Sequence, residues 1–141
     1  MTRVVLDTNV ILSGFINWRS RPGSLVAAAG RRYELVWTAA LVVECDRALA
    51  YPKVARRFKD PKAARAALAK LASLATLVDP DRLPALRVVE GDPDGDVLFA
   101  TALAGGARFI VSGDKRVLAV GSFAGVQVVG AAGFLAILGE E

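Results

Sequence analysis

The chain has 141 residues, a hydrophobic content of 54% and a net charge of +4, with 18 Lys and Arg against 14 Asp and Glu. This length fits one domain over residues 1–141, and no apolar stretch approaches the roughly 20 residues of a membrane span, so we expect a soluble protein. Histidine is absent and Cys45 is the single cysteine, which excludes Ser-His-Asp catalysis, a histidine-type zinc site and an internal disulfide, and favours the cytoplasm.

Short apolar runs alternate with helical patterns along the chain. The predicted strands are residues 3–6, 33–37, 86–89, 108–111 and 126–129, and the predicted helices are one from Val10 and those at residues 24–30, 39–50, 62–77, 96–104, 115–120 and 132–138. Thr38 and Asp60 are expected to cap helices, and Gly105-Gly106 to end one. Strands that alternate with helices predict an α/β fold, a mostly parallel sheet covered on both faces.

Four acidic residues carry the most chemical information. Asp7 follows the apolar run at residues 4–6, Asp114 follows the strand at residues 108–111, Asp96 opens a helix and Glu44 lies within one. Asp7 and Asp114 therefore come just past strand ends, where open parallel sheets bind ligands. Converging carboxylates repel one another unless a cation is bound between them, and oxygen-only ligands suit Mg²⁺ or Mn²⁺. The four acids predict a site for such an ion.

Each of these acids also has a structural interpretation. Asp7 and Asp114 stand at turns, where aspartate is a common helix cap. Glu44 lies in a helix that reads as mostly buried, where a carboxylate needs a partner, and Arg47 could supply an ion pair. The prediction of a metal site therefore depends on all four acids together.

The segment Asp92-Pro93-Asp94-Gly95-Asp96 holds three acids in five residues. It lacks the spacing and the final glutamate of an EF-hand calcium loop. Asp94 is the better candidate for simple helix capping, whereas Asp96 is expected to face the same sheet edge as Asp7.

Positive charge is concentrated between residues 53 and 70, where seven basic residues and Asp60 give a net charge of +6. Beside a carboxylate site for a metal ion, such a surface favours a phosphodiester substrate. The alternative is an ordinary solvated helix face. The basic residues predicted to bind the substrate are Lys53, Arg56, Arg57, Lys59 and Lys62.

Four segments taken together resemble the PIN-domain nucleases, most closely bacterial PIN proteins described as toxins of toxin-antitoxin pairs. They are residues 4–13 (VVLDTNVILS), Thr38 followed by Glu44, residues 96–102 (DVLFATA) and residues 109–115 (FIVSGDK). The resemblance implies a three-layer α/β/α sandwich and cleavage of single-stranded RNA with Mg²⁺ or Mn²⁺. By position it carries the catalytic and metal-binding roles onto Asp7, Glu44, Asp96 and Asp114, with Asn9 and Ser112 as supporting groups.

One position departs from the family pattern, because many members have an acid or an amide where this chain has Arg116. This leaves the number of metal ions open, and Arg116 is predicted to contact a phosphate of the RNA. The expected protein is a cytoplasmic endoribonuclease, the toxin of a toxin-antitoxin pair, with an antitoxin as a possible partner and a homodimer as its assembly. The alternatives are a solitary RNA-processing nuclease, a non-catalytic module that binds RNA or antitoxin, and a phosphoacceptor signalling domain built on Asp7 and Lys115.

Overall fold

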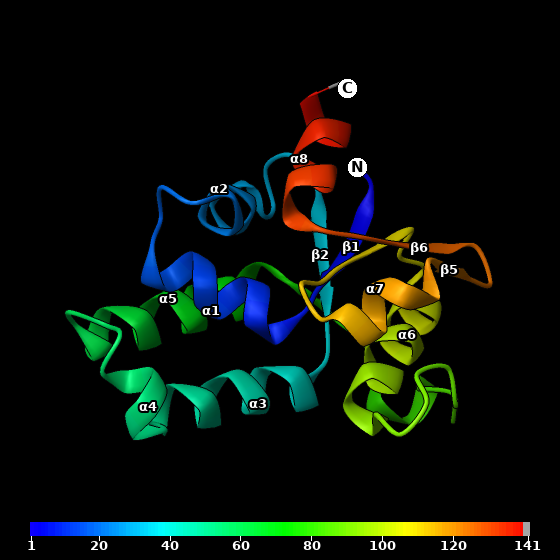
Figure 1. Cartoon of the computed structure of the whole chain (residues 1–141), viewed down its shortest axis with the longest axis horizontal. Coiled ribbons are helices and arrows are strands. Elements are labelled where there is room, and N and C mark those ends of the chain that lie inside the picture. The colour runs from blue at the N-terminus through cyan, green and yellow to red at the C-terminus, as the bar shows by residue number, and fades with distance from the viewer. Residues whose placement is uncertain (140–141) are drawn as a thin grey trace.

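The computed structural model describes residues 1–139, which form a six-stranded sheet flanked by helices (Figure 1). The strands are β1 (Arg3–Leu6), β2 (Glu34–Trp37), β3 (Thr76–Leu77), β4 (Phe109–Val111), β5 (Ser122–Phe123) and β6 (Val126–Val129). They lie in the order β3-β2-β1-β4-β6-β5. All neighbouring pairs run parallel except β5 and β6, which are antiparallel. The expected α/β fold with a mostly parallel central sheet is confirmed.

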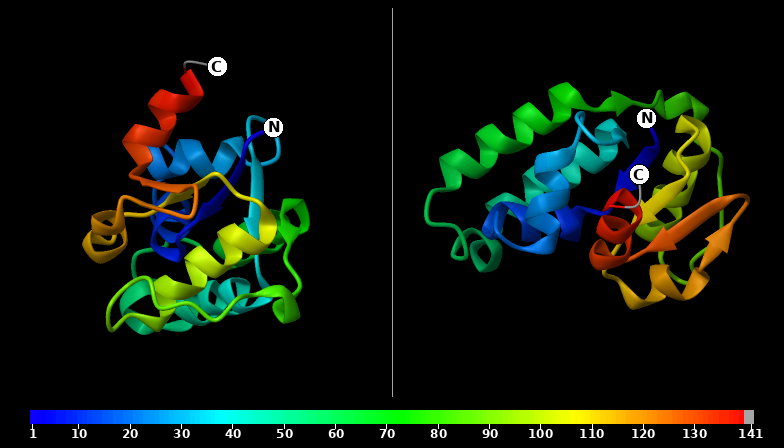
Figure 2. Two further views of the ribbon diagram at one scale, coloured as in Figure 1. Left: turned by 90° about the vertical axis from the view of Figure 1, so that its right-hand side faces the viewer. Right: turned by 90° about the horizontal axis from the view of Figure 1, so that it is seen from above.

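Helices cover both faces of the sheet (Figure 2). They are α1 (Thr8–Ile16), α2 (Arg21–Ala28), α3 (Ala39–Ala50), α4 (Pro52–Ala55), α5 (Pro61–Leu74), the 3-10 helix η1 (Pro80–Arg82), α6 (Pro93–Gly105), α7 (Lys115–Val120) and α8 (Ala131–Gly139). α6 packs on β1, β2 and β4. On the opposite face Phe134 of α8 packs against Phe109 of β4, with ring centroids 5.5 Å apart. α1, α3 and α5 pack against one another beside the sheet.

The centre of the sheet is fully enclosed. Val4, Val5 and Leu6 of β1 are all 0% exposed, and so are Leu35 and Val36 of β2. Strands buried on both faces carry continuous apolar runs rather than alternating ones, which is why these segments are easily recognised in the sequence.

β1 occupies the position where the order of the strands reverses, with β2 on one side and β4 on the other. The hydrogen bonding continues one residue past each strand end, because the Asp7 amide donates to the Val111 carbonyl at 2.9 Å and the Ser112 amide to the Val129 carbonyl at 3.1 Å. The residues that follow β1 and β4 therefore lie side by side at the carboxyl edge of the sheet. Open parallel sheets bind their ligands at this kind of position.

Helix ends agree with the sequence where a capping residue marks them. The Thr38 hydroxyl accepts from the Leu41 amide, and the Asp60 carboxylate accepts from the amides of the first turn of α5. Gly106 ends α6 in the left-handed conformation, with φ of 66°. Within residues 1–139, no helix is long and apolar enough to cross a membrane.

Two predicted elements are wrong. Residues 86–89 form a loop, because the amides of Val88 and Val89 donate to a side chain of α6 and not to a neighbouring strand. The helix predicted at residues 62–77 ends at Leu74, since Ala75 is extended and β3 then pairs with β2. Its apolar spacing continues past Leu74, so the pattern alone does not reveal the change.

Candidate functional site

An acidic hollow of about 160 Å³ lies at the carboxyl edge of the sheet, between the starts of α1, α6 and α7 and the side of α3. Five acidic residues line it: Asp7, Glu44, Asp92, Asp94 and Asp114. The N-terminal ends of α1 and α6 carry positive partial charge, which favours carboxylates there. We call this site the acidic hollow.

Asp7 occupies the N-cap position of α1, yet its side chain makes no capping hydrogen bond. The hydroxyl of Ser112 instead donates to Asp7 Oδ2 at 2.7 Å. Burial raises the pKa of Asp7, and the negative charge of Asp114 adds to the rise, while the bond from Ser112 acts in the opposite direction. The charged form of the Asp7 carboxylate therefore costs free energy in the folded protein, and helix capping does not explain why an acid stands there.

Ser112 links the two strand ends chemically. Its side chain is 0% exposed, and its oxygen, besides donating to Asp7, accepts from the backbone amide of Asp114 at 3.0 Å. Asp114 caps α7 by accepting from the Arg116 amide at 2.8 Å, and it also lines the acidic hollow. The structural interpretation of Asp114 therefore applies, while its metal-binding role stays a prediction.

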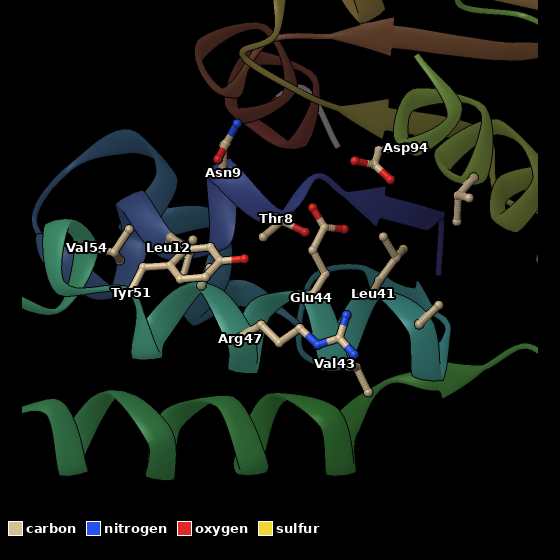
Figure 3. A pocket seen from close by; sticks show the side chains of 13 residues that line it. Thr8, Asn9, Leu12, Leu41, Val43, Glu44, Arg47, Tyr51, Val54 and Asp94 are labelled. Atoms are coloured by element: carbon tan, nitrogen blue, oxygen red, sulfur yellow. The ribbon is translucent and has the colours of Figure 1, made fainter. Parts of the chain in front are cut away.

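Glu44 reaches the acidic hollow from the second turn of α3. Its carboxylate points toward Thr8 and Asp94 (Figure 3). Partial burial raises the pKa of Glu44, and the negative charges of Asp94 and Asp7 raise it further. No ion pair joins Glu44 to Arg47 among the described residues, so the structural alternative for Glu44 is not realised.

The expectation that α3 is mostly buried is wrong. Only Leu41, Cys45 and Leu49 of this helix are buried in residues 39–50, and Glu44 itself is solvent-accessible on the wall of the hollow. The helix covers the core with one stripe and presents its other side to solvent.

At the start of α6 the structure reverses the places predicted for Asp94 and Asp96. Asp96 Oδ1 accepts from the amides of Val88 and Val89 at 2.7 and 2.8 Å, so this carboxylate fastens the preceding loop. Asp96 is not among the residues that line the acidic hollow, whereas Asp94 is. Two residues differ by about 200° around a helix axis, so the two side chains leave α6 on opposite sides.

The reason for the exchange is the point at which the helix begins. Asp92 is the N-cap, accepting from the Gly95 amide at 3.2 Å, and Pro93 occupies the first turn. The apolar pattern predicts a later start, at Asp96. The pair Asp-Pro, already used correctly for Asp60 and Pro61, is the signal that could have found the true start. A Cβ at Gly95 would come within 2.8 Å of Asp92 Oδ2, so glycine leaves room for this cap.

Arg116 lies among the acids. Its Nη2 is 3.5 Å from Asp92 Oδ2, and its Nε is 3.9 Å from Asp114 Oδ1. The arginine side chain is 61% exposed, so these pairs contribute little to stability. Their effect is local, because one positive charge partly offsets the repulsion between the carboxylates.

The oxygen-rich lining fits a hard divalent cation. The buried Thr8 hydroxyl adds an oxygen beside Glu44. Within residues 1–139, however, no three acidic side chains come close enough to hold one ion as they stand. Mutual repulsion of the carboxylates is a sufficient physical reason for their separation.

Two larger hollows continue from the acidic hollow. The first, which we call the α3 groove, measures about 550 Å³ and shares Asn9, Glu44 and Asp94 with it. The second measures about 350 Å³ and shares Asn9 and Asp114 with it. Asn9, predicted as a supporting group, is exposed where all three meet. The acidic hollow is thus open in two directions.

The basic residues predicted to bind substrate lie away from the acids. Lys53 belongs to α4, Arg56, Arg57 and Lys59 follow it, and Lys62 begins α5; all are exposed. Their role in binding remains a prediction.

The comparisons with known proteins agree with the fold. Residues 3–116 match the family model described as PIN domain. The chain is similar to a crystal structure of PAE2754 from Pyrobaculum aerophilum, with a TM-score of 0.60 and 18% sequence identity over 99% of this chain and 91% of that chain. At this identity the likeness concerns the fold. No curated protein matches the sequence at a significant level.

Proposed function

Because the chain belongs to the PIN domain family, whose members are generally nucleases, we propose that it is an endoribonuclease that cleaves single-stranded RNA with Mg²⁺ or Mn²⁺. The observation that carries this proposal is the acidic hollow at the reversal of the strand order. There Asp7 and Asp114 follow adjacent strands and share Ser112 as a hydrogen-bond partner.

The residues that would hold a divalent cation are Asp7, Glu44, Asp94 and Asp114. Asp94 takes the place that the sequence assigns to Asp96, because Asp94 lines the hollow. A cation bound there would neutralise the phosphodiester and lower the pKa of a water molecule. Burial, and after it neighbouring negative charge, raises the pKa values of Asp7 and Glu44, and bound positive charge would stabilise both carboxylates, which supports this assignment.

The protein's own groups would orient and deprotonate the attacking water. Ser112 holds the Asp7 carboxylate in one orientation through its hydroxyl. Glu44, whose carboxylate has a raised pKa and reaches solvent, is suited to accept the proton of the water. Attack at phosphorus with the 3′ oxygen as leaving group would give a 5′ phosphate and a 3′ hydroxyl.

The test is cleavage of a single-stranded RNA labelled at its 5′ end, with Mg²⁺, with Mn²⁺ and with EDTA. We expect cleavage with either ion, none with EDTA, and products that carry 5′ phosphates. Asp7→Asn should abolish cleavage while the protein stays folded by circular dichroism. Cleavage in EDTA, or an Asp7→Asn protein as active as the wild type, would contradict the proposal.

The resemblance to toxins supports a more specific role, namely arrest of growth through RNA cleavage. Induced expression of the wild type in a bacterial host should then arrest growth, whereas expression of Asp7→Asn to the same level should not. Equal growth in both cultures would favour a solitary RNA-processing nuclease.

A further inference from the structure

Exposed aromatic side chains are rare in this protein. The sequence has ten Phe, Trp and Tyr residues, and eight of them are buried or half-buried. The two exceptions are Trp18, 49% exposed, and Tyr51, 59% exposed. A single exposed ring is ordinary on a protein surface, so what matters is the surroundings of these two. Both line hollows that follow one another along α1, starting at the acids.

Tyr51 lines the α3 groove, next to the acidic hollow. Leu12 and Val54 lie near its ring, and Arg47 lines the same groove (Figure 3). The position of Tyr51 is fixed by the backbone, because it ends α3 and directly precedes Pro52, the first residue of α4. A residue before proline is held extended. The backbone that carries the ring is therefore restrained.

Trp18 lines a further hollow of about 450 Å³, which we call the Trp18 hollow. Three basic residues, Arg19, Arg57 and Lys59, share this lining. The acid in the same lining, Asp60, is engaged in capping α5. An aromatic ring surrounded by cations is a combination that matches nucleotides, since bases stack and phosphates pair with cations.

The indole is also held in place. Its ring packs on Phe15, with centroids 5.6 Å apart. The loop that carries it lies so close to α2 that a Cβ at Gly23 would come within 2.5 Å of the Trp18 carbonyl oxygen. The Ser20 hydroxyl donates to the Asn17 carbonyl at 2.6 Å and so closes the same loop. A ring held in this way loses little entropy when a base stacks on it.

The two hollows are successive along one helix. Thr8, Asn9 and Leu12 of α1 line the α3 groove, and Phe15 and Ile16 of α1 line the Trp18 hollow. From its first to its last residue α1 is about 12 Å long at 1.5 Å per residue. The two hollows therefore follow one another along α1, from the acids past Tyr51 to Trp18, over a length that a few nucleotides can span.

We propose that this path is the track of the RNA strand, with one unpaired base stacked on Tyr51 beside the bond to be cut and another on Trp18, while Arg47, Arg57 and Lys59 contact phosphates. The inference rests on the proposed function and adds to it the surface and the residues that hold the single strand. Only a single strand can stack its bases on protein rings, because a duplex keeps its base faces covered. The track therefore selects single-stranded over double-stranded RNA.

Two measurements in EDTA test the track without cleavage. The first is intrinsic fluorescence: Trp37 is 0% exposed and outside the track, so quenching by a short single-stranded RNA should come from Trp18 and disappear in Trp18→Phe. The second is anisotropy of a labelled RNA. Trp18→Ala and Tyr51→Ala should each weaken binding by about 5- to 150-fold, the range for loss of one stacked base.

Matched variants separate stacking from other effects. Trp18→Phe and Tyr51→Phe keep a ring and should bind nearly as the wild type. Leu77→Ala removes another exposed apolar side chain, at β3 and outside both hollows, and should change nothing. A duplex of the same sequence should bind more weakly than the single strand and leave the fluorescence of Trp18 unchanged.

The inference is overturned if both alanine variants bind single-stranded RNA as the wild type does. It is also overturned if these variants change the sedimentation coefficient of the protein but not its RNA binding. The rings would then belong to an interface between two protein chains. Its failure is distinguishable from that of the proposed function. A protein that binds RNA through the track and cuts nothing contradicts the nuclease, whereas a protein that cuts RNA regardless of Tyr51 and Trp18 contradicts the track.

Discussion

Asp7 illustrates how a single buried carboxylate can oppose the stability of the folded protein. Its pKa is raised above the ordinary value of 3.8 by burial and by Asp114. Folding therefore favours the protonated form, and the folded protein loses stability as the pH rises through the range between 3.8 and the raised pKa. A neutral side chain of the same shape avoids this loss.

Asp7→Asn should consequently raise the melting temperature by a few degrees at pH 7 in EDTA, because asparagine removes the charge and keeps an oxygen that accepts from Ser112. The gain should shrink toward zero as the pH falls below 3.8, the ordinary pKa, because Asp7 then becomes protonated in the unfolded state as well as in the folded state. Thermal unfolding at pH 7 and at pH 3.5 measures it. A variant less stable than the wild type at pH 7 would show that the charged carboxylate is stabilising.

Asp94 and Asp96 allow a matched comparison. Asp94→Asn should lower cleavage by at least about tenfold, because a lining carboxylate loses its charge. Asp96→Asn should cleave within about twofold of the wild type and be less stable by about 1–2 kcal/mol, since its bonds to the Val88 and Val89 amides lose their charge. RNA cleavage rates and urea unfolding measure the two effects. The reverse pattern of cleavage would restore Asp96 as the functional acid.

The helices and strands that can be predicted are those that an apolar run or a capping residue marks in the sequence. β1 and the boundaries of α3 follow from an apolar run and from the cap at Thr38. The places of Asp7, Glu44 and Asp114 at the acidic hollow could be predicted, because each has a fixed position relative to such an element. The place of Asp94 in the lining of the hollow was not predicted, because the direction of its side chain depends on the first residue of α6. The exposure of Tyr51 and Trp18 was not predicted, because exposure of a ring is a property of packing, which single-residue patterns do not encode.

The basic segment that surrounds α4 gives a prediction at the scale of an element. Reversal of Arg56, Arg57 and Lys59 to glutamate should weaken RNA binding and flatten its dependence on salt, by about one unit of the logarithmic slope for each phosphate that the protein no longer neutralises. The same reversal at Arg31, Arg82 and Arg87, which are exposed and outside both track hollows, is the control of equal charge. Equal slopes in the two triple variants would mean that the segment around α4 binds no phosphate.

At the scale of the whole molecule, the fold and the family are established, and the assembly is a prediction. Alanine-rich helices such as α5 offer apolar surface for a two-fold contact. Sedimentation equilibrium at tens of micromolar should therefore show a dimer. A mass near 14.8 kDa, that of one chain, would contradict it.

The acidic hollow is continued by a hollow on the side of Glu44 and by another on the side of Asp114. A strand that enters along α1 would therefore meet no blind end at the acids and could leave past Asn9. The enzyme would then have no need of a free terminus, unlike a nuclease that trims ends. Circular RNA, which has no terminus to thread, should be opened as readily as a linear molecule of the same sequence.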